Sequence, residues 1–350
     1  MNLLIITQVV DTQDPILGFF HQWIEEFAKH CEKVTVICLR EGEHAFPGNV
    51  RVLSLGKEVG ASRVKYLSRF YLYIWRQQKQ YDAVFVHMNP EYVILGAMIW
   101  RLLKKRIALW YTHKSVNSTL RFATRFAHVI FTASKESFRI KSAKVQVVGH
   151  GIDTDLFQFQ EKTTAQSVRL ISVGRISRVK RQDLAIETLA ELGERNIDAI
   201  LSVVGVPLTE NDQSYKQELV QLAKRRGVHG HLVWRGPVVN TRLPEELERA
   251  NILLHTSETG SLDKVVLEAM ACGVPVVSSS EAVSAVVTSD LKSYTGIAAQ
   301  PTALADVIMQ VCGNADHFQH IRLSSLRVAR GHALRPLIEN IVHTTSAIHV

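Results

Sequence analysis

The chain has little that could build a redox or metal framework. It has four cysteines in 350 residues, at positions 31, 38, 272 and 312, with neither Cys-x-x-Cys nor zinc spacing. Such sparse usage is typical of a reducing compartment. No run of eighteen apolar residues could span a bilayer, and the first residues have the pattern of a core strand rather than a signal peptide. We therefore expect a cytoplasmic protein.

Acidic residues are fewer than basic ones, and the imbalance is local. The chain has 41 Lys and Arg against 33 Asp and Glu, a net charge of +8, and residues 57–106 alone hold ten basic and three acidic residues. No helix-turn-helix, zinc finger or aromatic RNA-binding stretch accompanies this excess. We therefore expect no nucleic-acid partner.

Short apolar runs alternate with helical patterns in both halves of the chain, which predicts parallel α/β sheets in two domains. The polar segment 158–167 interrupts the alternation and is predicted to be a linker between domains at 1–157 and 168–350, with the last helix at the domain junction. The predicted strands of the first sheet are 2–7, 33–38, 50–55, 82–87, 107–112, 128–133 and 145–148; those of the second are 168–173, 199–204, 231–235, 251–255 and 274–278.

Residues 259–277 have the order of a glycine-bearing loop, a short helix and a buried strand. This order favours a phosphate site, because the first N–H groups of a helix point at its positive dipole end. Glu268, one turn along, could accept hydrogen bonds from ribose hydroxyls. The alternative is a helix end with a glycine cap before a core strand. The predicted ligand-binding positions of the loop and helix start are Gly260, Ser261, Leu262, Asp263, Lys264 and Val265.

A second anion-binding turn is predicted some ninety residues upstream. The apolar run 169–174 ends in a glycine, and Arg175 and Lys180 follow at the start of a helical pattern. A guanidinium and an ammonium on one strand-to-helix turn can face the same ligand at the carboxyl edge of a parallel sheet. Each alone would usually be a solvated surface charge. With the first segment they suggest the two halves of a diphosphate clamp.

These segments resemble the donor domain of retaining glycosyltransferases of the GT-B fold, glycosyltransferase family 4 (group 1). The similarity covers about residues 165–345 and is carried by Gly174-Arg175 with Lys180, Val204-Gly205 and the stretches 250–257 and 267–277. It implies two Rossmann-like domains with parallel sheets facing across a cleft. It also implies that 1–157 binds the acceptor and 168–350 the nucleotide sugar.

The resemblance also implies residue roles. Arg175 and Lys180 would hold the donor diphosphate during the reaction, Gly205 would lie at the donor site, and Glu268 would match the second glutamate of the family's E-x7-E pattern. The sequence departs from that pattern eight residues earlier, where Gly260 replaces the glutamate that meets the transferred sugar. Glu258 or Asp263 could substitute only if the loop differs.

The amino-terminal half resembles the family more weakly. Gly18, where the family commonly has a glycine pair, would approach the donor phosphate or serve only as a loop hinge. His113 is predicted to end the strand 107–113 and matches a family histidine near the acceptor and the transferred sugar, although a lone histidine is more often structural.

A helix predicted over 63–79 carries basic and aromatic residues beside an apolar stripe, Val64, Leu67, Tyr71, Ile74 and Trp75. We expect residues 61–79 and 101–106 to contact an anionic membrane surface, on the inner face of the plasma membrane. The alternative is that the stripe packs on the first sheet and the arginines are solvated.

The resemblance implies transfer of a hexosyl group from a nucleotide diphosphate sugar to a hydroxyl, with retention and without a dedicated general base. We expect no metal cofactor, because two fixed cations suffice to hold the diphosphate. The expected acceptor is lipid-linked or a polysaccharide, in the synthesis of cell-surface polysaccharide, lipopolysaccharide or glycolipid. A non-catalytic nucleotide-sugar binder and an epimerase of the same fold are the alternatives.

Overall fold

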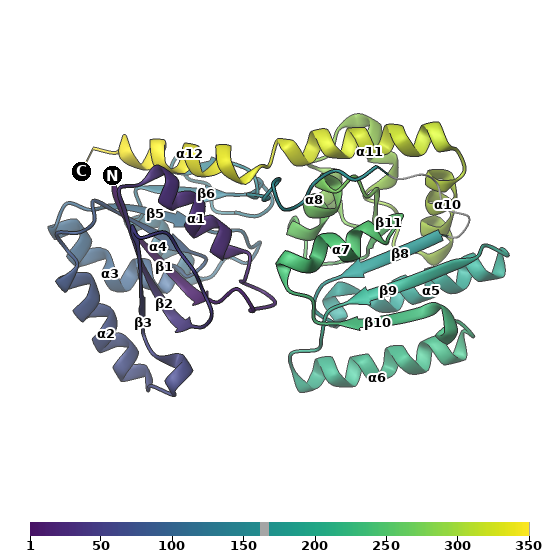
Figure 1. The fold of residues 1–350 in the computed structure, drawn as a ribbon, viewed down its shortest axis with the longest axis horizontal. Helices are drawn as coiled ribbons and strands as arrows, with labels where there is room; N and C mark the ends of the chain where they lie inside the picture. Colours follow the sequence, from purple (N-terminus) through teal and green to yellow (C-terminus); the bar gives the residue numbers. More distant parts are fainter. Residues whose placement is uncertain (162–167, 350) are drawn as a thin grey trace. The chain divides into compact units, whose positions relative to one another are not determined.

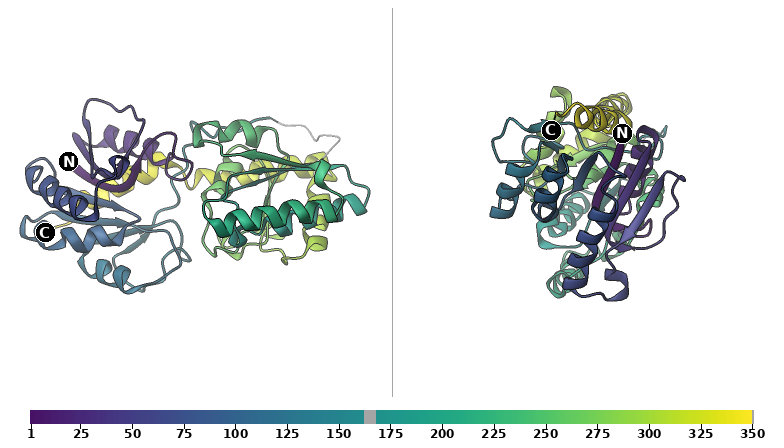
Figure 2. Two further views of the ribbon diagram at one scale, coloured as in Figure 1. Left: turned by 90° about the horizontal axis from the view of Figure 1, so that it is seen from below. Right: turned by 90° about the vertical axis from the view of Figure 1, so that its left-hand side faces the viewer.

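The computed structural model describes residues 1–161 and 168–349, which form two compact units (Figures 1 and 2). Unit 1 consists of Met1–Asp153 and the C-terminal segment from Ala333, and unit 2 is Thr154–His332. Of the predicted linker 158–167, residues 162–167 lie outside the described residues.

Unit 1 is built on a parallel sheet in the order β3-β2-β1-β4-β5-β6-β7. Alternate residues of its central strands face two separate apolar layers: Leu3 and Ile5 belong to one buried cluster, and Leu4 and Ile6 to the other. Both faces are therefore covered, as parallel sheets require. The strands are β1 (Asn2–Val10), β2 (Lys33–Glu41), β3 (Val50–Ser54), β4 (Ala83–His87), β5 (Arg106–Trp110), β6 (Val129–Thr132) and β7 (Val145–Val147).

The helices of unit 1 divide between these two faces. Helices α1 and α12 pack against each other over the face that carries Leu3 and Ile5 (Figure 1), and α2, α3 and α4 supply the cluster on the other face. The helices are α1 (Phe20–His30), α2 (Arg63–Arg76), α3 (Pro90–Leu102), α4 (Ser118–Phe126) and α12 (Leu334–Ser346), with a short 3-10 helix, η1 (Lys57–Val59), before α2.

Helix α12 belongs to unit 1; the sequence analysis included it in 168–350 and placed it at the domain junction. Its apolar residues Leu334, Leu337, Ile338 and Ile341 are buried in the cluster that contains Trp23 and Phe27 of α1. The backbone N–H of Leu334 also donates to the carbonyl of Ile152, at 2.8 Å. The chain therefore returns to the first unit at Ala333.

Unit 2 is built on a second parallel sheet, in the order β10-β9-β8-β11-β12. Every pairing in both sheets is parallel within the described residues. The strands are β8 (Val168–Val173), β9 (Ala199–Val204), β10 (Leu232–Gly236), β11 (Ile252–His255) and β12 (Val276–Ser278). All twelve predicted strands are therefore present, and two Rossmann-like α/β units are confirmed.

The helices of unit 2 pack on this sheet and on each other. Helix α5 contacts α6 and α10, while α8 contacts α11 and the strands β11 and β12. The α-helices are α5 (Gln182–Glu194), α6 (Glu210–Arg225), α7 (Leu243–Glu248), α8 (Lys264–Ala271), α9 (Glu281–Ser284), α10 (Pro301–Cys312) and α11 (Ala315–Arg330); the 3-10 helices are η2 (Arg178–Lys180), η3 (His229–His231), η4 (Asn240–Arg242) and η5 (Ser289–Tyr294).

Two glycines allow the ends of β8 and β9 to approach closely. Gly174 has φ +144° and Gly205 has φ +136°, conformations that L side chains rarely adopt. A Cβ added to Gly205 would lie 2.0 Å from the carbonyl oxygen of Gly174. The loop after β8 therefore keeps its position only if residue 205 lacks a side chain.

We predict that Gly205→Ala lowers the free energy of unfolding by about 3 kcal/mol, because backbone strain and a backbone clash act together. Gly227→Ala is the matched control, since Gly227 also has a left-handed φ of +72° but no atom within 4 Å of an added Cβ. The control should cost about 1 kcal/mol. Urea denaturation of the three proteins tests this prediction, and equal losses in the two variants would contradict it.

Candidate active site

The loop after β8 presents a cation at the carboxyl edge of the second sheet. Gly174 follows the strand, Arg175 is 45% exposed, and its Nε lies 4.0 Å from Oδ2 of Asp212. Lys180 ends the short helix η2, and its side chain is mostly buried. A Cβ at Gly174 would meet the aliphatic part of Lys180 at 3.5 Å, so the lysine lies directly over the glycine turn.

Lys180 belongs to a chain of polar contacts that links four elements. Its Nζ lies 2.6 Å from Oδ2 of Asp263, and the same oxygen lies 2.8 Å from Nε2 of His255. Nδ1 of His255 lies 2.9 Å from the hydroxyl of Ser278. The last residue of η2, the residue before α8, the last residue of β11 and the last residue of β12 are therefore fixed together.

The loops after β8 and β11 also contact each other through backbone groups. The hydroxyl of Thr256 donates to the carbonyls of Lys180 and Arg181, at 3.0 and 2.9 Å. The N–H of Glu258 donates to the carbonyl of Val179 at 2.8 Å. The two predicted anion-binding turns are thus adjacent, at the point where β8 and β11 pair in the middle of the sheet.

Asp263 is the N-cap residue of α8, but its side chain makes no capping hydrogen bond to the helix. Its carboxylate turns instead to Lys180 and His255. Burial acts to raise the pKa of Asp263, but the hydrogen bonds and charges of His255 and Lys180 outweigh it and hold the pKa below its usual value. Asp263 is therefore ionised at neutral pH, at the positive end of α8.

The start of α8 differs slightly from the prediction. The helix begins at Lys264, so Lys264 and Val265 supply its first turn, while Gly260, Ser261 and Leu262 belong to the preceding loop. Ser261 and Leu262 are buried in this loop.

Glu268 lies inside α8 and is almost fully buried. Its Oε1 accepts a hydrogen bond from Nδ2 of Asn240 at 3.3 Å and lies 3.8 Å from Nζ of Lys264. Burial raises the pKa of Glu268, and the nearby Lys264 charge and the Asn240 hydrogen bond offset this only in part. The two acids of this segment therefore have pKa values shifted in opposite directions.

The loop at the expected position of the first family glutamate has its own conformation. Gly260 has φ +65°, in the left-handed region that a glutamate would occupy only under strain. The carboxylate of Glu258 is half exposed and pairs with the guanidinium of Arg181. Asp263 is the acid in contact with Lys180. Within this loop, Asp263 is therefore the acid that lies beside the predicted anion-binding lysine, and Glu258 is not.

The other two predicted residues, Gly18 and His113, lie in unit 1. The N–H of Gly18 donates to the carbonyl of Asp14 at 3.0 Å, and a Cβ at Gly18 would lie 2.6 Å from that oxygen, so this turn before α1 requires glycine. His113 is exposed, and its Nδ1 accepts from the N–H of Ser115 at 3.1 Å. The sequence predicted His113 as the last residue of a strand, but it lies beyond that strand, because β5 ends at Trp110, its last residue paired with β4 and β6.

Sequence reasoning missed two polar residues of the site. His255 ends β11 and holds Asp263, and Asn240 of η4 reaches Glu268. A histidine at the carboxyl end of a buried strand was a visible signal for His255. Asn240 lies in a loop with no pattern that marks it.

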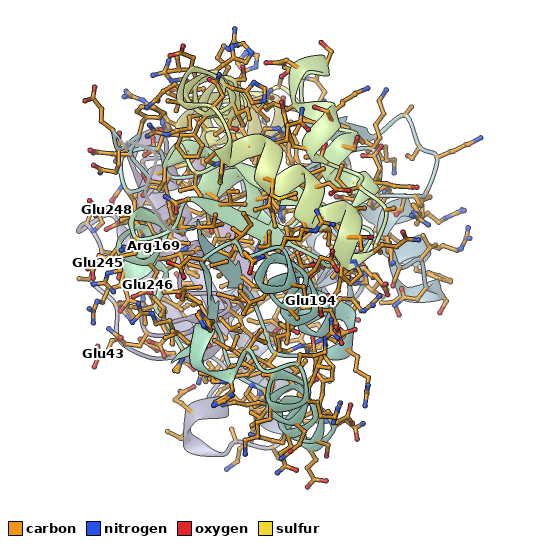
Figure 3. The ribbon with its side chains drawn as sticks, turned by 90° about the vertical axis from the view of Figure 1, so that its right-hand side faces the viewer. Glu43, Arg169, Glu194, Glu245, Glu246 and Glu248 are labelled. Carbon is orange, nitrogen blue, oxygen red and sulfur yellow. The ribbon has the colours of Figure 1, made fainter. Side chains whose placement is uncertain are left out.

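The residues of the structure offer no metal centre. Within 1–161 and 168–349 no group of three or more His, Cys, Asp or Glu side chains is arranged to hold a metal ion. The triplet Asp153-Thr-Asp155 has the Asp-x-Asp form but falls on the boundary between the units and belongs to no such group. Helix α7 carries three acidic residues, Glu245, Glu246 and Glu248 (Figure 3), and Glu246 pairs with Arg235 and Arg249.

Comparisons with known proteins agree with this architecture. The family described as "Glycosyl transferases group 1" matches residues 153–322, and the family "Glycosyl transferase 4-like" matches residues 16–134. The structure of HepE from Anabaena in complex with UDP superposes with a TM-score of 0.81 at 18% identity, covering 99% of this chain and all of that one. Sucrose-phosphate synthase from Thermosynechococcus elongatus superposes with a TM-score of 0.76 at 15% identity, covering 99% and 98%.

Sequence relatives match a shorter region. A D-inositol 3-phosphate glycosyltransferase of Kribbella flavida is 30% identical over 167 residues, 44% of this chain and 39% of the relative. A mannosylfructose-phosphate synthase of Agrobacterium fabrum is 25% identical over 153 residues, 41% of this chain and 34% of the relative. The chain thus matches less than half the length of these relatives.

The two Rossmann-like units and the solved structures that share them define the GT-B fold. The two family matches, one in each half, then place the chain more narrowly. It belongs to the group 1 glycosyltransferases of the family 4 type.

We predict that Asp263→Asn destabilises the protein by about 2 kcal/mol at pH 7, because charge-assisted hydrogen bonds to Lys180 and His255 are lost. The pKa of Asp263 is lowered on folding. The contribution of the Asp263 charge to the free energy of unfolding is therefore fully present above the pKa of an unfolded aspartate, about 3.9. It is lost as the pH falls below that value. Urea denaturation at pH 7, 4 and 3 should show the gap between variant and wild type narrowing only between pH 4 and pH 3.

Glu268→Gln provides the contrasting comparison. The pKa of Glu268 is raised on folding, so its ionisation costs stability as the pH rises above about 4.3. The glutamine variant should therefore gain relative to wild type between pH 4 and pH 7. The same trend with pH in both variants would contradict the assignment.

Proposed function

We propose that this protein transfers a glycosyl group from a nucleoside diphosphate sugar to an acceptor hydroxyl with retention of anomeric configuration. The observation that carries the proposal is the adjacency of Lys180 and the start of α8 at the centre of the second sheet. The solved structures of HepE with UDP and with UDP-glucose, which share the fold, support a nucleotide sugar as the donor.

Each part of the site has a role in this reaction. Lys180 and Arg175 bind the diphosphate, the first-turn amides of α8 contribute further donors, and Glu268 accepts from the ribose hydroxyls. Negative charge grows on the diphosphate as it leaves. Fixed cations beside that charge stabilise the transition state more than the ground state.

The transfer needs no other charged group. The bond between the anomeric carbon and the diphosphate oxygen breaks, and the acceptor oxygen forms a new bond to the same face of that carbon. The acceptor proton passes to the departing diphosphate. We propose that no metal takes part, since Arg175 and Lys180 supply the positive charge.

For the acceptor we propose a lipid-linked molecule of cell-surface glycan synthesis, reached at the inner face of the plasma membrane. The names of the relatives from Kribbella and Agrobacterium support a second candidate, a soluble phosphorylated polyol or sugar. No helix in the described parts of the chain has both the length and the apolar character to cross a bilayer. Membrane contact would then have to be made by surface side chains.

The exposed face of α2 supports such contact. Of the predicted apolar stripe, Ile74 is buried, but Val64 is 74% exposed, Leu67 41% and Trp75 57%. Tyr71 and Ile74 of the stripe pack on the cluster under the sheet, as Phe70 does, so packing accounts for only part of the stripe. Lys65 and Arg76 are exposed on the same helix.

The neighbouring helix α3 repeats this combination of side chains. Met98 and Leu102 are exposed beside Arg101. Contacts between the aromatic rings of Phe70 and Trp100 show that α2 and α3 pack side by side. Two neighbouring helices of unit 1 therefore both expose apolar and basic side chains.

We predict that Arg175→Ala and Lys180→Ala each weaken binding of the preferred nucleoside diphosphate (UDP, GDP or ADP) at least about tenfold, because each removes a charged hydrogen-bond donor. Isothermal titration calorimetry measures the effect. Arg178→Ala is the control, since its guanidinium pairs with Glu218 at 2.6 Å in the same turn. An equal loss in this control would contradict the site.

Turnover separates the proposal from its alternatives. A panel of nucleotide sugars with acceptor alcohols should give a glycoside whose anomeric proton has the coupling of the donor configuration. Nucleotide binding without any product would favour a non-catalytic binder. A sugar released with altered stereochemistry and no acceptor would favour an epimerase.

We predict that the protein floats with vesicles containing anionic phosphatidylglycerol more than with neutral phosphatidylcholine vesicles. Replacing Lys65 and Arg76 by Gln should lower the bound fraction of protein about tenfold or more, because each basic side chain near the surface contributes about 1 kcal/mol. Lys224→Gln with Arg225→Gln on α6 is the control. Equal recovery with both lipids would contradict membrane contact.

A further inference from the structure

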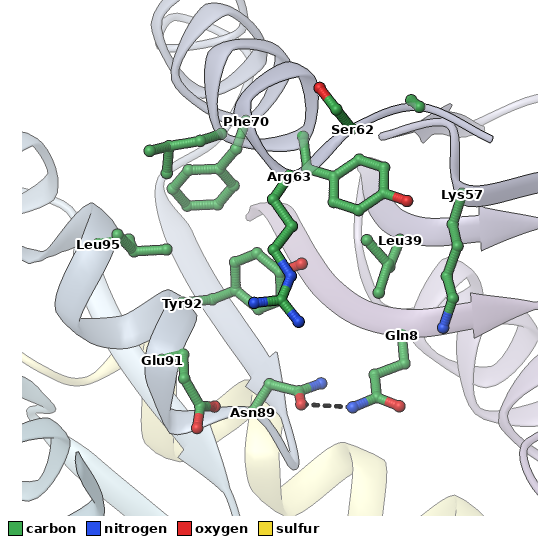
Figure 4. A pocket seen from close by; sticks show the side chains of 13 residues that line it. Gln8, Leu39, Lys57, Ser62, Arg63, Phe70, Asn89, Glu91, Tyr92 and Leu95 are labelled. Atoms are coloured by element: carbon green, nitrogen blue, oxygen red, sulfur yellow. Dashed lines mark hydrogen bonds between the residues drawn. The ribbon is translucent and has the colours of Figure 1, made fainter. Parts of the chain in front are cut away.

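Unit 1 contains a cavity that the donor site does not use. It has a volume of about 770 Å³ and lies between β1, the start of α2 and the start of α3 (Figure 4). Sites for small molecules generally measure about 300–1,000 Å³. The cavity is therefore of the size that binds a ligand.

The cavity lies at the place where a parallel sheet offers a binding crevice. Strand order reverses between β1 and β4, which pair with each other while their next neighbours lie on opposite sides. Gln8 near the carboxyl end of β1 and Asn89 just after β4 form the polar floor, and Gln8 donates to Asn89 at 2.7 Å (Figure 4). Ligands of open α/β sheets bind at such a reversal.

The walls combine apolar surface with charge. Leu67 and Phe70 of α2 and Leu95 of α3 line one side. Lys57 of η1 and Arg63 at the start of α2 also line the cavity, and neither makes an ion pair within the residues that the structure describes. A ligand with an apolar chain and an anionic group matches both kinds of wall.

The cavity lining also includes one carboxylate, which can bind a hydroxyl group of the ligand. Glu91, in the first turn of α3, lines the cavity near Asn89 (Figure 4). A carboxylate and an amide pair can bind sugar hydroxyls by accepting and donating hydrogen bonds. The polar floor is therefore suited to the acceptor end of the ligand.

The apolar wall continues onto the exposed face of α2. Leu67 lines the cavity and is also 41% exposed, on the helix that carries the exposed Val64 and Trp75. A chain that leaves the cavity at this side meets the surface proposed to contact the membrane.

We propose that this cavity binds the acceptor, and that the acceptor is a phosphate-bearing amphiphile whose phosphate is held by Lys57 and Arg63 and whose chain lies against Leu67, Phe70 and Leu95. This inference rests on the proposed glycosyl transfer and selects the lipid-linked acceptor over the soluble phosphorylated polyol.

Farnesyl phosphate, below its critical micelle concentration, is the probe, and calorimetric titration of the full chain is the measurement. Farnesol lacks the phosphate, and inositol 3-phosphate and inorganic phosphate lack the chain. Farnesyl phosphate should bind at least about tenfold more tightly than each of the three, because only it engages both walls of the cavity. Inositol 3-phosphate binding as tightly would overturn the proposal in favour of a soluble acceptor.

Arg63→Gln should weaken farnesyl phosphate binding about tenfold while leaving farnesol unchanged. Leu67→Gln should weaken farnesyl phosphate but not inorganic phosphate. Arg121→Gln, exposed on α4 and outside the cavity lining, is the control. Equal losses in Arg63→Gln and Arg121→Gln would show non-specific surface binding and overturn the proposal.

UDP binding, titrated in the same samples, keeps the two proposals apart. Retained UDP binding without selective binding of farnesyl phosphate rejects only the acceptor cavity. Selective farnesyl phosphate binding by a chain that binds no nucleoside diphosphate rejects the proposed transfer and leaves the cavity as an amphiphile site.

Discussion

The reversal of strand order in each parallel sheet is the constraint on which both sites depend. The chain places β2 and β4 on opposite sides of β1, and β9 and β11 on opposite sides of β8. Because parallel crossovers are right-handed, the connections on the two sides of the reversal cover opposite faces, and a crevice opens between them at the carboxyl edge. The loops with Lys180 and Asp263 occupy that position in unit 2, as do Gln8 and Asn89 in unit 1.

Close approach of backbone segments helps to fix the position of the Lys180 side chain before any ligand binds. Gly205 allows the turn after β8 to lie against β9, and this fixes the backbone that leads to Lys180. Asp263 and His255 then hold the lysine side chain. An ammonium has three N–H donors, so Lys180 can keep its contact with Asp263 and still donate to a diphosphate. The cost of ordering a long side chain is thus met during folding rather than during binding.

The sequence predicted the strands well because buried parallel strands are continuous apolar runs. The predicted 168–173 and 199–204 are β8 and β9 to the residue. Partners distant in sequence could not be predicted in the same way. An amphipathic pattern shows that α12 has an apolar face but not which core receives it, and the helical stripe of α2 left open whether Val64 and Trp75 pack on the sheet or stay exposed. The contact of His255 with Asp263 depends on how β11 and α8 pack, which no local pattern encodes.

Asp263 and Glu268 show how one short segment can give two carboxylates different chemistry. Asp263 meets two cation-forming groups and stays ionised, so it fixes a positive charge in place. Glu268 is buried with weaker partners, and its neutral form is favoured more than in water. Ribose hydroxyls that donate to Glu268 would stabilise the ionised form and lower its pKa. Nucleotide binding and the pKa of Glu268 are therefore coupled in the proposed site, whereas Asp263 is ionised at neutral pH.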